Sequence, residues 1–170
     1  MRRLFHSDAQ VLGDIEYRML VLGKSFTVKD RYEGVSDGSS VYYVIANEGS
    51  KNGWIINVDV TASGKSYINI YFFPELSDKG TLLPIVKHNM LLATYEETSV
   101  KVYRDPTITS TGTLGLKDMI SGGIGKRAMG SMQNIGFSSL MPPGTVLLIE
   151  VVNESGATAD VVFEVNWWEE

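Results

Sequence analysis

The sequence has no cysteine and only two histidines among its 170 residues. The lack of cysteine excludes a disulfide framework, a thiolate-ligated zinc or iron–sulfur site, and a thiol nucleophile. The histidines, His6 and His88, lie far apart in the chain, whereas catalytic zinc and non-haem iron sites combine several close imidazole or carboxylate ligands. We therefore expect no metal ion and no other cofactor.

Basic charge is also scarce, with 15 Lys and Arg against 20 Asp and Glu, a net charge of −5. Nucleic-acid binding needs a clustered basic face, and the densest basic pairs are only Arg2-Arg3 and Lys126-Arg127. The longest apolar runs, such as 146–149, have the length of a strand, far below the ~18 residues of a membrane-spanning helix. We expect neither nucleic acid nor a membrane as a partner.

The motifs of common enzymes are missing as well. Gly23-Lys24-Ser25 and Gly64-Lys65-Ser66 lack the earlier glycine that a phosphate-binding loop requires. No Gly-x-Ser-x-Gly nucleophile elbow occurs. The adjacent carboxylates Glu96-Glu97 would point to opposite faces of a strand, and Glu169-Glu170 are interpreted as solvated charge. The chain is therefore not expected to be an enzyme.

What the sequence does contain is alternation with a period of two, the sign of half-buried strands. Segment 54–60 predicts one face of Trp54, Ile56, Val58 and Val60 and an opposite face of Ile55, Asn57 and Asp59. The turn 62–65 then leads into a second alternating strand, 66–72, which suggests a hairpin. Residues 145–152 are almost all apolar, as in a strand buried on both faces, and 161–168 alternate again.

Further strands are predicted at 17–22, 25–29, 41–46, 89–95 and 99–104, separated by turn residues. This pattern predicts an all-β fold, an antiparallel β-sandwich or jelly roll. We expect a single sandwich domain over residues 17–170, preceded by an N-terminal arm over residues 1–16. No apolar segment follows the basic start of the arm, so we do not expect a signal peptide.

Residues 110–141 differ from the rest because they are rich in glycine and methionine and poor in charge. One interpretation is two weakly patterned strands with turns. The other is an adaptable contact surface, because methionine repacks easily against partners. Elsewhere, exposed aromatic side chains can bind sugars or proteins, and the alternation predicts outward positions for Tyr42, Tyr67, Tyr71 and Trp168.

The sequence has one more informative feature, the order in which turn and strand segments follow one another over residues 40–170. The segments are Ser77–Pro84, His88-Asn89, Val102–Thr109, Thr111-Gly112-Thr113, Met141–Thr145, Val151–Gly156 and Trp167-Trp168-Glu169. In this layout the chain resembles a group of tailed-bacteriophage virion proteins of the β-sandwich or jelly-roll type, which decorate or cement the head. The resemblance carries over no catalytic residue.

The resemblance implies a structural role on the outer capsid surface of the virion, after assembly in the host cytoplasm. The implied partners are the major capsid protein and further copies of the chain, with a trimer favoured. Candidate contact residues are Arg2, Arg3, Phe5, Met119, Lys126, Arg127, Met129, Met132 and Trp168. Two alternatives stay open, a carbohydrate- or receptor-binding module and a tail or collar component of the virion.

Overall fold

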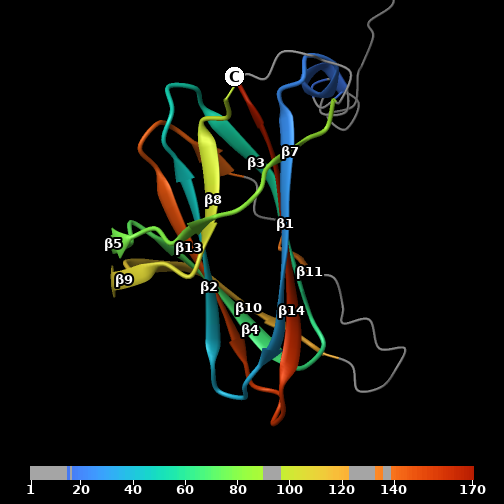
Figure 1. Ribbon diagram of the computed structural model, residues 1–170, viewed down its shortest axis with the longest axis vertical. Helices are drawn as coiled ribbons and strands as arrows, with labels where there is room; N and C mark the ends of the chain where they lie inside the picture. Colours follow the sequence, from blue (N-terminus) through green and yellow to red (C-terminus); the bar gives the residue numbers. More distant parts are fainter. Residues whose placement is uncertain (1–14, 16, 90–96, 123–132, 136–138) are drawn as a thin grey trace, which may run out of the picture.

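The computed structural model describes residues 15, 17–89, 97–122, 133–135 and 139–170, and these residues form mainly antiparallel strands (Figure 1). The strands are β1 (Ser25–Val35), β2 (Ser40–Asn47), β3 (Gly53–Ala62), β4 (Ser66–Phe72), β5 (Glu75–Asp78), β6 (Thr81–Leu82), β7 (Val86–Lys87), β8 (Val100–Arg104), β9 (Thr107–Ser110), β10 (Thr113–Ile120), β11 (Gln133–Ile135), β12 (Ser139–Met141), β13 (Val146–Asn153) and β14 (Ala159–Glu169). No helix among these residues is long and apolar enough to cross a membrane.

The strands form two large sheets packed face to face. Sheet A has the order β11-β3-β14-β1-β7, with β12 also paired to β3, and sheet B has the order β10-β4-β13-β2-β8-β6. Strands β5 and β9 pair separately and project from the side of sheet B (Figure 1).

The order of strands along the chain makes this sandwich a jelly roll. The first four strands alternate between the sheets, and β13 lies in sheet B beside β2 while β14 lies in sheet A beside β1. The result is a pair of four-stranded faces, β1-β14-β3-β11/β12 and β2-β13-β4-β10, which is a double Greek key. The expected all-β sandwich is confirmed.

The core fills the space between the two sheets, where alternate residues of each strand point inward. In β14 every second side chain is buried, including Phe163 and Trp167, as the alternation predicts. The ring of Phe163 stacks on Tyr43 of sheet B, with 4.1 Å between centroids. Strand β13 is buried on both faces as predicted only over 147–149, where Leu148 contributes to a second apolar cluster on the outer side of sheet B, whereas the outward Glu150 and Val152 are half-buried.

Three local predictions are wrong. Residues 17–21 are helical instead of extended, since Leu22 N donates to Arg18 O at 3.0 Å and the single buried Met19 anchors the turn. Strands β3 and β4 do not form a hairpin, because the turn at 62–65 carries the chain from sheet A to sheet B. The predicted faces of 54–60 hold for the buried Val58 and Val60 but fail at Trp54 and Ile55, because a register shift with β14 places Ile55 in the core and Trp54 outside.

Two other predictions fall mostly on residues that the structure does not describe. The arm, residues 1–16, lies outside the described residues except for Ile15, and the predicted strand 89–95 lies outside them except for Asn89. Within 110–141 the described residues form β10, β11 and β12.

Two buried asparagines connect the sheets at opposite ends of the sandwich. Asn47, the last residue of β2, donates its amide to the carbonyls of Lys51 at 2.8 Å and Met141 at 2.6 Å. Asn153, the last residue of β13, donates to Val35 O of β1 at 2.8 Å. Buried backbone carbonyls need such partners, so each amide ties a loop to the facing sheet.

A buried carboxylate makes a third connection between the sheets. Glu169 is 2% exposed, and it accepts hydrogen bonds from the backbone N–H groups of Ser99 at 2.8 Å and Val100 at 2.9 Å. Trp167 Nε1 donates to the same carboxylate at 3.1 Å. The interpretation of Glu169 as solvated charge is therefore wrong, because its side chain joins the end of β14 to the start of β8.

The Glu169→Ala substitution should be strongly destabilising, because it leaves three buried donors without an acceptor. We expect the free energy of unfolding to fall by roughly 3 kcal/mol or more, measured by urea denaturation. Glu170→Ala is the matched control, since this neighbour is exposed, and its effect should stay within about 0.5 kcal/mol. Equal effects of the two substitutions would contradict the role given to Glu169.

Candidate functional site

A polar cluster on the outer face of sheet B is centred on Glu150 of β13. Ser40 Oγ and Tyr42 OH each donate to Glu150 Oε1 at 2.8 Å. Asn69 Nδ2 and Tyr71 OH donate to Oε2 at 2.9 and 2.8 Å. A carboxylate offers about four acceptor positions, so these donors saturate Glu150 and fix both tyrosine rings. We call these five residues the Glu150 cluster.

The Glu150 cluster changes the titration of its members. Burial raises the pKa of Glu150, but the four hydrogen bonds lower it more, so the net shift is downward. Burial and the bond to Glu150 raise the pKa of Tyr71 to about 12. The pKa of Tyr42 is raised for the same two reasons. The carboxyl group is thus the ionised acceptor and the phenols are the neutral donors.

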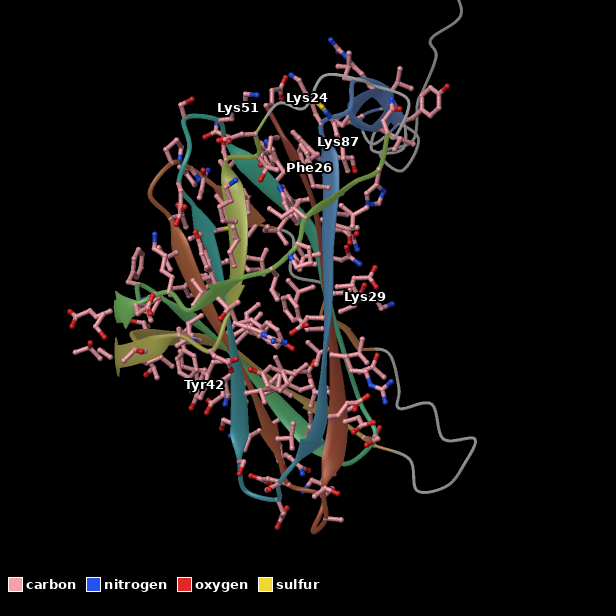
Figure 2. The ribbon with its side chains drawn as sticks, viewed as in Figure 1. Lys24, Phe26, Lys29, Tyr42, Lys51 and Lys87 are labelled. Carbon is pink, nitrogen blue, oxygen red and sulfur yellow. The ribbon has the colours of Figure 1, made fainter. Side chains whose placement is uncertain are left out.

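The fixed tyrosines support the projecting pair of strands β5 and β9. Tyr42 and Tyr71 pack with the buried Val44 and Leu148, and Leu76 of β5 and Ile108 of β9 pack on the same apolar cluster. Figure 2 shows Tyr42 on the outer side of sheet B, next to these two strands. The Glu150 cluster therefore orders an aromatic platform at the base of the projecting β5–β9 sheet.

Tyr67 extends this platform along β4. The ammonium groups of Lys65 and Lys117 lie over its ring, 5.1 and 5.2 Å from the centroid. Met119 is the cross-strand partner of Tyr67 on β10 and is 45% exposed. Aromatic, methionine and cationic groups thus meet on one outward surface, a mixture typical of protein interfaces.

The outer face of sheet A carries a smaller aromatic pair. Trp54 and Trp168 are cross-strand partners whose rings stack with centroids 5.1 Å apart. Leu140 of β12 pairs with Trp54 and is 42% exposed. Ion pairs such as Lys29–Glu164, at 3.1 Å, occupy the rest of this face, and exposed pairs of this kind contribute little stability.

A second polar cluster joins β1 to β8 at the side of the sandwich. Arg104 Nη1 donates to the carboxylate of Asp30 at 3.4 and 3.5 Å, and the Tyr32 hydroxyl donates to Asp105. Burial and nearby Asp30 raise the pKa of Asp105 and of the buried Tyr43. Perturbed groups of this kind occur in active sites and in structural networks alike. Here the guanidinium bridges the two sheets.

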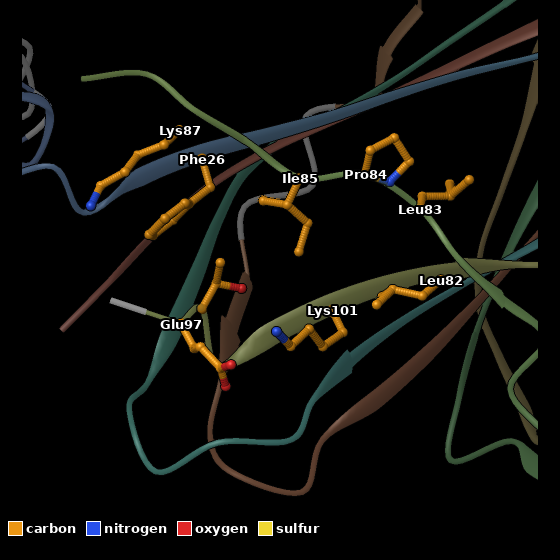
Figure 3. A pocket seen from close by; sticks show the side chains of 9 residues that line it. Phe26, Leu82, Leu83, Pro84, Ile85, Lys87, Glu97 and Lys101 are labelled. Carbon is orange, nitrogen blue, oxygen red and sulfur yellow. The ribbon is translucent and has the colours of Figure 1, made fainter. Parts of the chain in front are cut away.

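An apolar pocket of about 290 Å³ opens between β1, β7 and β8. Figure 3 shows Phe26 and Ile85 facing Leu82 and Lys101 across it. The lining residues are Phe26, Leu82, Leu83, Pro84, Ile85, Lys87, Glu97, Thr98 and Lys101. The pocket therefore combines an apolar interior with two lysines and one carboxylate. Among the described residues no group of three potential metal ligands occurs.

The structure describes two of the predicted contact residues, and it places them on different faces. Met119 lies on the outer face of sheet B and Trp168 on the outer face of sheet A, on opposite sides of the sandwich. The other predicted contact residues lie outside the described residues: Arg2, Arg3, Phe5, Lys126, Arg127, Met129 and Met132. Tyr42, Tyr67 and Tyr71 do take the outward positions that the alternation predicts.

Comparison with known proteins adds no relative. No protein-family model matches the chain, and no curated protein matches it.

The Glu150 cluster makes stability depend on acid pH. The folded-state pKa of Glu150 lies below its ordinary value of 4.5, so the unfolded chain takes up the proton first as pH falls. The stabilisation is complete above the unfolded pKa and is lost as pH falls through the folded pKa. Glu150→Gln should cost about 1–2 kcal/mol at neutral pH and should flatten the loss of stability between about pH 6 and pH 3.

Denaturation at a series of pH values measures this effect. The exposed Glu33→Gln is the control and should leave the pH dependence unchanged. A Glu150→Gln variant with the wild-type pH profile would show that Glu150 has no such role.

Proposed function

We propose that this protein is a non-enzymatic structural protein of a bacteriophage virion, of the head decoration or cement type. In this proposal it binds the major capsid protein on the outer surface of the head as a homo-oligomer, with a trimer favoured. The carrying observation is the jelly-roll strand order, an architecture used by viral capsid domains. The order of turn segments over residues 40–170 supports the same proposal.

The described surface supplies groups suited to stable contacts. Phe73 and Leu82 are exposed to 82% and 51%, and burying them would remove apolar area from water, which contributes ~25 cal/mol per Å². The cost of ordering the partners offsets part of this gain, which repeated contacts on a lattice can compensate. Such a protein would strengthen the head by covering surface, without any chemical step.

A carbohydrate- or receptor-binding module is the second candidate. The platform of Tyr42, Tyr67 and Tyr71 supports it, because jelly rolls also serve as lectins and aromatic rings pack against apolar surfaces. A tail or collar component of the virion would share the fold and differ in copy number.

Sedimentation with particles tests the first candidate. Purified protein should sediment with mature heads of the virus that encodes it and should saturate at many copies per head. Saturation at only a few copies would favour the tail or collar, and no binding to any virion part would contradict the virion role.

A glycan array tests the second candidate. We expect no glycan binding that depends on Tyr71 or Trp168, because in the first candidate these rings serve protein contacts or the fold. Glycan binding that Tyr71→Ala or Trp168→Ala abolishes would identify a carbohydrate module, provided that circular dichroism shows each variant folded. Leu114→Ala, on the edge strand β10, is the matched control.

A further inference from the structure

The residue after β4 combines backbone strain with exposure. Phe73 has a φ of 58°, in the left-handed region that disfavours residues with a Cβ. Its ring is 82% exposed, so burial in this chain does not compensate the strain. Strained residues of this kind cluster at functional sites, and exposed aromatic rings often become the anchors of interfaces. Phe73 therefore has the features of an interface anchor, a side chain that binds in a pocket of a partner.

The apolar pocket between β1, β7 and β8 has the size and the lining to accept an aromatic side chain. Its volume is about 290 Å³, and a cavity of about 150 Å³ lined by similar residues can hold a benzene ring. Phe26 and Leu83, which are buried, form part of its wall. An aromatic side chain that enters it would exchange water for apolar contacts.

The anchor and the pocket lie at opposite edges of the same sheet. Phe73 follows β4, next to the edge strand β10, whereas the pocket adjoins β8 and β6 at the far edge. Two strands of sheet B, β13 and β2, separate β4 from β8. Phe73 is thus placed to enter the pocket of a second copy and not its own. Contacts between unlike surfaces of identical chains form rings when the rotation closes.

Charge around the two features is complementary. The exposed Glu75 follows Phe73 by two residues, and Asp78 ends the same strand, also exposed. The pocket is lined by Lys87, Lys101 and Glu97, and Lys101 also lies near the carboxylate of Glu48. A carboxylate beside the anchor would therefore meet the ammonium group of Lys101 at the rim, and such a pairing of opposite charges favours the correct orientation and its rate of formation.

We propose that Phe73 of one copy inserts into the pocket lined by Phe26, Leu83 and Ile85 of a second copy, and that Glu75 approaches Lys101 at its rim. The repeated contact closes a ring, which gives the homo-oligomer of the proposed function its interface. The proposal rests on that function only for the existence of an oligomer.

Light scattering after size exclusion, over a range of protein concentrations, tests the contact. The wild type should form a ring, and Phe73→Ala should raise the dissociation constant roughly 30-fold or more, as the loss of an aromatic hot spot does. Leu114→Ala, an exposed apolar residue near the same edge, is the matched control and should leave the oligomer intact. Ile85→Trp, which fills the pocket from its wall, should dissociate the ring as Phe73→Ala does.

Exchanging the charges of Glu75 and Lys101 tests the contact without changing the apolar packing of Phe73. Glu75→Lys and Lys101→Glu should each weaken the oligomer, and the double variant should restore it. Circular dichroism shows whether each variant folds. An oligomer that survives both Phe73→Ala and the single charge reversals would overturn this contact and leave the virion role untouched.

A wild type that stays monomeric at every concentration would also overturn the contact. The virion role would then depend on the sedimentation experiment alone. A monomer that binds the apolar dye ANS, with binding lost in Ile85→Trp, would identify the pocket as a small-molecule site instead and would likewise overturn the proposal.

Discussion

The two sheets can exclude water from the space between them only if the polar backbone at the strand ends finds partners inside the protein. Asn47, Asn153 and Glu169 provide those partners, and each joins one sheet to the other. Removing a partner from a buried donor or acceptor costs more than the hydrogen bond itself contributes. The core aromatic stack of Tyr43 on Phe163 depends on this closure, because its rings come from different sheets.

The outer surfaces depend on the same requirement, because half-buried polar groups also need hydrogen-bond partners. Glu150 is saturated by four donors from the two strands that flank it, and the two tyrosines it holds support the paired strands β5 and β9. A polar cluster thus decides the position of an apolar one. Surface features that could bind a partner are consequently fixed before the partner arrives, which lowers the ordering cost of binding.

Alternation along the chain was enough to predict the all-β class and the inner and outer faces of β4 and β14. It did not predict which sheet a strand joins, because the turn at 62–65 has the same composition whether it closes a hairpin or crosses to the facing sheet. A single register shift reversed the faces of Trp54 and Ile55. The Glu150 cluster was invisible to the sequence because its members come from separate strands, and the strain at Phe73 depends on a φ that no local motif announces.

Strand β14 lies between β1 and β3 in the middle of sheet A. It pairs with β1 along its length, and the Thr27 hydroxyl donates to the carbonyl of Val165, 138 positions away. During synthesis, β1 and β3 therefore emerge long before the strand that separates them exists. Non-local pairing of this kind slows folding and leaves unpaired strand edges open to other chains. The yield of folded protein should accordingly be limited by kinetic competition between completing sheet A and aggregation, even where the finished jelly roll is stable.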